Sequence, residues 1–102
     1  MGRIVFENND GQGLLTMEED ISVGDAFLLR KALEDSLHNC SRLIIRLDDL
    51  ASADLSTLQL LVSARKSFQK AGLEIRADGD IPPVFKALVN DAGYSHQMKW
   101  FE

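Results

Sequence analysis

The chain has 102 residues, which suits a single domain over residues 1–102. Its 16 acidic against 11 basic residues give a net charge of −5, which disfavours partners such as nucleic acid or an anionic membrane surface, because both require concentrated positive charge. A hydrophobic content of 45% can form a packed core, and the single cysteine, Cys40, excludes an internal disulfide.

A β-hairpin is expected at the start of the chain. Residues 3–7 (RIVFE) and 13–17 (GLLTM) have the composition of short strands. Residues 8–11 (NNDG) between them are a strong turn signal, because Asn, Asp and Gly tolerate positive φ.

An amphipathic helix is expected over residues 23–38. Ser22 and Asp25 form a variant of the capping box, in which a hydroxyl and a carboxylate satisfy unpaired amides at a helix start. Apolar residues then recur at helical spacing, opposite a charged face.

Strands and helices alternate in the second half. Residues 43–47 (LIIRL) are nearly all aliphatic, as in a central strand, and residues 73–77 (LEIRA) alternate as in a partly exposed strand. An apolar stripe predicts a helix over 56–71, and a Pro-Pro pair opens a third helix over 83–92. The tail over 94–102 is expected to be a short docking segment or an edge strand.

These elements predict an α/β fold in the order β-β-α-β-α-β-α. Because strand–helix–strand crossovers are right-handed, the helices can pack on the same side of the sheet. We therefore expect one mixed sheet of about four strands, in a single layer, with the helices mainly on one face. The N-terminal segment is too polar for a signal peptide, and no apolar run reaches the roughly 20 residues of a membrane span. A cytoplasmic protein is the natural interpretation.

The most informative polar residues lie within residues 47–67 (LDDLASADLSTLQLLVSARKS). Asp48, Asp49 and Asp54 are oxygen donors of the kind that Mg²⁺ and Ca²⁺ prefer. The spacing of a calcium loop and any Gly-rich phosphate loop are absent, however. We therefore expect solvated loop acids and no metal or other cofactor.

The two histidines do not suggest an enzyme. His38 belongs to the last turn of the first predicted helix, and His96 lies in the tail. No Ser-His-Asp or Cys-His set with assigned supports can be built from them. We expect no catalytic residues.

The start of the second helix admits two interpretations. Asp54, Ser56 and Thr57 put a carboxylate and hydroxyls over unpaired N–H groups, which is ordinary capping chemistry. The same arrangement presents hydroxyls beside the positive end of the helix dipole, where a phosphate would be stabilised. The residues alone leave both open.

The order of elements and the strand–loop–helix around Asp54 resemble the STAS family, named for sulfate transporters and anti-sigma-factor antagonists. In that family a strand like LIIRLDDL leads to a motif close to Asp-Ser-Ser/Thr-Gly-Leu that opens a helix. The matching residues here are DLSTL, residues 54–58. The resemblance covers nearly the whole chain, including residues 69–79 (QKAGLEIRADG) and 84–93 (VFKALVNDAG).

The resemblance implies a bacterial regulatory module that acts in signal transduction and transcription regulation, without enzymatic activity. Such a module docks on a protein partner, such as an anti-sigma factor, a serine kinase-like protein or another signalling protein. The wording ADLSTLQLLVSARKS also resembles stand-alone STAS proteins of chemotaxis clusters and STAS subunits of phospholipid-transport ABC complexes, which remain alternatives.

Family members are often switched by phosphorylation of the serine directly after the motif's Asp. That position is Leu55 here, and Thr57 replaces the motif's glycine. An exposed Leu55 would suit a constitutive contact, while an inward Leu55 would be core. We expect partner contact at the second-helix start and the neighbouring loops, with any phosphorylation on Ser56 or Thr57; the contact residues are Asp20, Ser22, Asp54, Leu55, Ser56 and Thr57.

Overall fold

The computed structural model describes residues 2–97. The strands are β1 (Arg3–Asn9), β2 (Gln12–Ile21), β3 (Arg42–Arg46), β4 (Leu50–Ala53) and β5 (Glu74–Asp78). The helices are α1 (Ala26–Asn39), α2 (Leu55–Lys70) and α3 (Pro83–Asp91), with 3-10 turns η1 (Val23–Asp25) and η2 (Ser95–Gln97).

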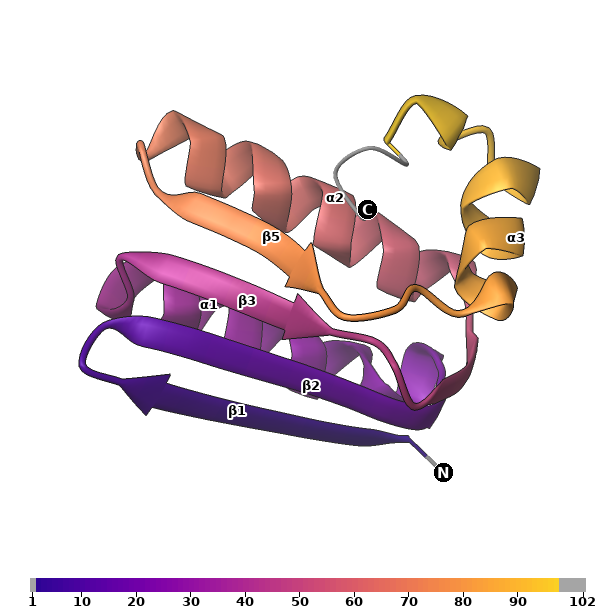
Figure 1. Cartoon of the computed structure of the whole chain (residues 1–102), viewed down its shortest axis with the longest axis horizontal. Helices are drawn as coiled ribbons and strands as arrows, with labels where there is room; N and C mark the ends of the chain where they lie inside the picture. Colours follow the sequence, from indigo (N-terminus) through magenta and orange to yellow (C-terminus); the bar gives the residue numbers. More distant parts are fainter. Residues whose placement is uncertain (1, 98–102) are drawn as a thin grey trace.

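One mixed sheet of five strands organises the chain (Figure 1). Its strands follow the order β1-β2-β3-β5, with β1 antiparallel to β2 and the other pairs parallel. The short strand β4 pairs with the last three residues of β2, Glu19 to Ile21, and the register shifts between Glu19 and Asp20. Strand β4 therefore lies beside the end of β2, where the chain continues into η1 and α1.

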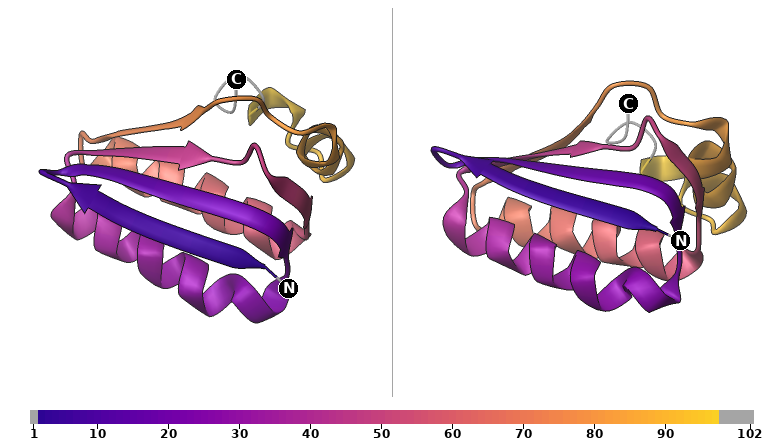
Figure 2. Two further views of the ribbon diagram at one scale, coloured as in Figure 1. Left: turned by 60° about the horizontal axis from the view of Figure 1, so that its bottom comes forward. Right: turned by 90° about the horizontal axis from the view of Figure 1, so that it is seen from below.

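Helices α1 and α2 lie side by side on one face of the sheet, and α3 packs at its end beside β4 (Figure 2). The side chains that point from the sheet toward these helices are apolar, and those at its centre are fully buried, for example Leu15 in β2 and Ile45 in β3. Phe68 of α2 and Phe85 of α3 are the largest fully buried side chains. The core therefore lies between the sheet and its helices.

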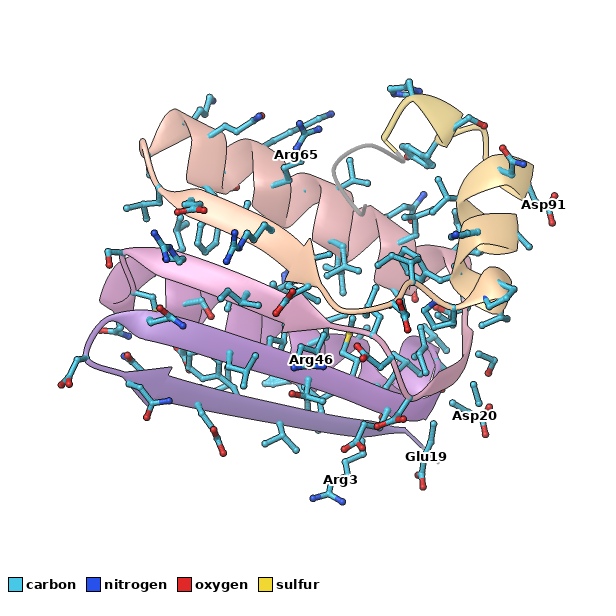
Figure 3. All side chains as sticks on the ribbon, viewed as in Figure 1. Arg3, Glu19, Asp20, Arg46, Arg65 and Asp91 are labelled. Atoms are coloured by element: carbon cyan, nitrogen blue, oxygen red, sulfur yellow. The ribbon has the colours of Figure 1, made fainter. Side chains whose placement is uncertain are left out.

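The opposite face of the sheet carries charged residues in ion pairs between strands. Because side chains alternate along a strand, Arg42 and Arg46 point away from the helices that cover Leu43 and Ile45. Arg42 contacts Glu74 of β5 at 2.8 Å, and Arg3 contacts Glu18 of β2 at 3.5 Å. Arg3 and Arg46 are labelled in Figure 3. These pairs give the open face a solvated, mixed-charge character.

The predicted fold class is confirmed, with one addition. The structure has a fifth strand, β4, where the sequence indicated only an acidic loop, and β2 continues to Ile21 rather than ending at Met17. Both segments lack an apolar alternation, since β4 reads LASA and the end of β2 reads EEDI. They are strands because they pair with each other. Of the tail, residues 95–97 form η2, and residues 98–102 lie outside the described residues.

Candidate functional site

The start of α2 is organised by the carboxylate of Asp54. This residue is the N-cap of α2, in an extended conformation. Its Oδ1 atom accepts hydrogen bonds from the Thr57 backbone N–H and hydroxyl, each at 3.2 Å, and from the Ser56 hydroxyl at 2.6 Å. The carboxylate cap expected from the sequence is therefore present, but both hydroxyls donate to Asp54 and do not themselves accept from helix N–H groups.

Asp54 also connects α2 to the segment before α1. The backbone N–H of Val23 in η1 is a further donor to its carboxylate. Burial raises the pKa of Asp54, but the hydrogen bonds from Ser56, Thr57 and Val23 outweigh that effect and lower the pKa below its usual value. The contacts at the start of α2 and the nearby Val23 backbone thus favour the charged form of Asp54.

The structure brings the other expected contact residues to the same end of the sheet. Asp20 accepts a hydrogen bond at 2.7 Å from the Ser52 hydroxyl of β4, the strand that leads into Asp54. Ser22 opens η1, and its backbone N–H donates to the Asp25 carboxylate at 3.0 Å. In Figure 3, Asp20 and Glu19 lie at the end of the molecule where β2 finishes. Because β2 ends beside β4, the residues at the end of β2 and those at the start of α2 lie at the same end of the sheet.

Exposure separates the three residues that follow Asp54. Leu55, the first residue of α2, is 45% exposed, so the structure does not place it in the core. Ser56 is half-buried and Thr57 is only 1% exposed. The one side chain of the three that points into solvent is therefore apolar.

Further apolar side chains are exposed at the same end of the molecule as Leu55, and they were not predicted from the sequence. Val23 is 72% and Phe27 is 67% exposed, and Phe27 lines a shallow hollow together with Ser56 of α2. We call Val23, Phe27 and Leu55 the helix-start surface. The sequence could have indicated the exposure of Phe27, because this residue falls outside the apolar stripe of α1 that contains Leu29 and Leu33. Leu28, 62% exposed, adjoins Phe27 in α1.

The other residues considered as metal ligands or catalytic groups do not form a site together. Within residues 2–97, no group of three or more His, Cys, Asp or Glu side chains could hold a metal ion. Asp48 contacts Arg46 at 3.1 Å, and this hydrogen bond raises the pKa of the Arg46 guanidinium. Burial raises the pKa of the Cys40 thiol. His38 contacts the Glu34 carbonyl within its own helix at 2.8 Å.

The described part of the chain contains no helix long and apolar enough to cross a membrane.

Comparisons with known proteins agree on the fold. A family model of the STAS domain matches residues 3–101. The phosphorylated form of the Bacillus cell fate determinant SpoIIAA superposes with a TM-score of 0.77 at 10% identity, covering 98% of this chain and 89% of that one. An anti-sigma factor antagonist from Mycobacterium paratuberculosis gives 0.74 at 17% identity, covering 98% and 83%.

The same fold occurs in a different setting. The murine anion transporter Solute Carrier 26 family member A9 gives a TM-score of 0.62 at 13% identity, over 87% of this chain but only 18% of the transporter. A comparison with the sequences of curated proteins finds no match. At these identities the structural likeness establishes the fold, and function has to be argued from the site.

Proposed function

The chain belongs to the STAS domain family, and we propose that it is a non-enzymatic docking module of the anti-sigma factor antagonist kind, which binds a protein partner through its helix-start surface. Asp54 acts in this proposal as a positioning residue. It interacts with the Val23 backbone in η1 and caps α2, so that Val23 and Leu55 come to the same end of the molecule.

The observation that carries the proposal is the exposure of Leu55 at the first position of α2. A large apolar side chain in solvent loses the free energy that burial would provide, about 1.5–3 kcal/mol when complete. Exposed apolar groups that gather at one place mark interaction sites in soluble proteins. Leu55 shares its end of the molecule with Val23 and Phe27, which are more exposed still.

The contact is proposed to be constitutive. SpoIIAA occurs in a phosphorylated and an unphosphorylated form. The family's phosphoacceptor position corresponds to Leu55, which has no hydroxyl. Ser56 donates its hydroxyl to Asp54 at 2.6 Å, and Thr57 is buried, so neither offers a free hydroxyl in its place. Binding is therefore controlled by the amounts of the two proteins rather than by a phosphate.

The partner is proposed to be an anti-sigma factor or a related serine kinase-like protein in the bacterial cytoplasm. Support comes from the antagonists whose fold this chain shares over 98% of its length. An apolar surface that adjoins the Asp54 cap suits a partner with an apolar pocket, because hot spots of protein interfaces are apolar groups that become fully desolvated.

The proposal is tested by affinity capture from the native cell extract with three proteins: the parent chain, Leu55→Asp and Val84→Asp. Val84 is a matched control, because it is 38% exposed at the start of another helix, α3. We expect one serine kinase-like partner with the parent and with Val84→Asp, and none with Leu55→Asp.

Capture that is equal for all three proteins would refute docking through the helix-start surface. Capture of a transporter ATPase that depends on Leu55 would keep the surface but replace the antagonist role by that of a transport-complex subunit.

A further inference from the structure

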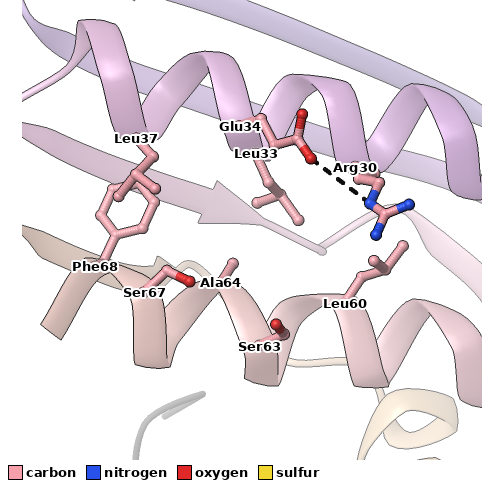
Figure 4. Close-up of a pocket in the computed structure, with 9 residues that line it drawn as sticks. All are labelled: Arg30, Leu33, Glu34, Leu37, Leu60, Ser63, Ala64, Ser67 and Phe68. Atoms are coloured by element: carbon pink, nitrogen blue, oxygen red, sulfur yellow. Dashed lines mark ion pairs between the residues drawn. The ribbon is translucent and has the colours of Figure 1, made fainter. Parts of the chain in front are cut away.

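A groove runs between α1 and α2 on the side away from the sheet (Figure 4). Two adjoining hollows form it, and both are lined by Arg30, Glu34 and Leu60. Together they extend from the start of α1, at Ala26, to Leu37 near its end. At a rise of 1.5 Å per residue, this corresponds to about 17 Å of helix. We call it the interhelix groove.

The floor of the interhelix groove is apolar, and its wall on α2 consists of short side chains. Leu33 and Phe68 are buried at its base, and Leu60 is half-buried. On α2, Ser63 and Ser67 lie one turn apart along the wall, and Figure 4 shows their short side chains beside the groove. Small residues at these positions leave room for another backbone to approach α2 closely.

The charge at the groove is opposite to that of the whole chain. Arg30 and Lys31 line it from α1, while Lys66 and Lys70 line a hollow on α2 that shares Ser63 and Ser67 with the groove. Among the described residues that line these hollows, Glu34 is the one acid, and it contacts Arg30 at 3.6 Å. The protein as a whole carries −5. Its acidic side chains thus lie elsewhere, and the groove has a basic rim.

We propose that the interhelix groove binds an acidic amphipathic helix of a partner protein. A helix laid along two parallel neighbours packs at about 8–10 Å from each, and its apolar face would cover Leu33, Leu60 and Phe68. Its acidic residues would then meet the lysines of the rim. This binding site adjoins the helix-start surface, with which it shares Phe27, but it does not depend on the proposed function.

A helix fits the groove better than a membrane or a nucleic acid does. Leu33, Leu60 and Phe68 form the recessed floor, where a bilayer could not reach them, whereas membrane-bound helices expose their apolar face. Four cations beside an ion-paired Glu34 are few for a phosphate backbone. Among the described lining residues, Phe68 is fully buried, which leaves Phe27 as the aromatic side chain exposed enough to stack on a base. Concave shape and charge together favour an acidic helix.

The test uses a synthetic peptide of about 18 residues, long enough to form a helix, with Leu at helical spacing and Glu elsewhere. One control peptide has the same composition in scrambled order, and another has Lys in place of Glu. Binding is followed by fluorescence anisotropy, and the surface is mapped by NMR amide shifts of the labelled full chain. We expect saturable binding of the first peptide alone, with shifts confined to α1 and α2.

Two variants locate the site. Lys66→Glu with Lys70→Glu is expected to weaken binding about tenfold through repulsion, and Ser63→Trp is expected to block the groove. Arg76→Glu, a single charge reversal at an exposed residue of β5, should change affinity less than about twofold. Leu55→Asp, which tests the helix-start surface, should leave peptide binding unchanged.

Three results would overturn the proposal. They are equal binding of the scrambled peptide, shifts that lie outside the groove, and affinities that Ser63→Trp and the lysine reversals leave unaltered. Binding of phosphatidylglycerol vesicles, but not of the peptide, through the same lysines would show that the groove serves a membrane and would likewise refute the helix.

Discussion

Replacing Asp54 by alanine removes one acceptor from four donors: the backbone N–H groups of Val23 and Thr57 and the hydroxyls of Ser56 and Thr57. Loss of an N-cap alone costs about 0.5–2 kcal/mol. The Thr57 hydroxyl belongs to a residue that is 1% exposed, and a buried polar group left without its partner costs about 1–3 kcal/mol more. We therefore expect Asp54→Ala to lower the free energy of unfolding by about 2–4 kcal/mol.

The assay is urea unfolding at neutral pH, followed by circular dichroism, with thermal melting as a second measure. For a domain of this size, each kcal/mol lowers Tm by about 4–8 °C. Asp54→Asn keeps an acceptor oxygen and a favourable cap, so its loss should be smaller, about 1 kcal/mol or less. Asp49→Ala, at an exposed aspartate in the preceding loop, is the control and should be near neutral.

The pH dependence follows from the same contacts. Since the hydrogen bonds lower the pKa of Asp54 in the folded state, its contribution is complete above the unfolded value of about 3.9 and is lost as the pH falls through the folded pKa. The difference between parent and Asp54→Ala should therefore shrink below about pH 4. An alanine variant that loses less than about 0.5 kcal/mol at neutral pH would refute the view that the Asp54 carboxylate stabilises the start of α2.

Further outcomes can be checked on the same protein. Leu55→Ser should remain folded and lose no more than about 1 kcal/mol in urea unfolding, because Leu55 is already 45% exposed; a large drop in Tm would mean that it is core. Mass spectrometry of the protein from its own host should find no stoichiometric phosphate; any that occurs should lie on Ser56, and phosphate on the buried Thr57 would contradict the structure. Gly79→Ala should lose more than about 1 kcal/mol, because Gly79 has a φ of +82° and a Cβ there would meet the Asp48 carboxylate; an unchanged unfolding midpoint would disprove that contact.

The sequence predicted the parts of the fold that have a clear hydrophobic period. The aliphatic run at residues 43–47, most of which is β3, could be recognised because nearly all of its residues are apolar and buried. The helix α2 could be recognised because its buried apolar residues recur at helical spacing. Strand β4 was not, because its four residues carry no such pattern and are held by their pairing with β2. Pairing between residues far apart in the chain produces no recognisable sequence pattern in so short a strand.

The candidate site divides in the same way. The cap by the Asp54 carboxylate is local in sequence and was predicted, whereas the Ser56 and Thr57 hydroxyls donate to that carboxylate instead of capping N–H groups themselves. The contact between Asp54 and the Val23 backbone joins residues far apart in the chain, so no local pattern could reveal it. The hydrophobicity of Leu55 alone could not predict whether its side chain is buried or exposed. The packing of α2 determines the direction in which this first residue points.

The central claim is that a partner contacts Leu55 in the cell, and site-specific photo-crosslinking tests it most directly. A photoreactive amino acid is placed at position 55 in one strain and at position 76, on the open face of the sheet, in another. We predict one crosslinked protein at position 55, the same one that affinity capture finds, and none at position 76. Crosslinking at position 76 without any at position 55 would contradict docking through the helix-start surface.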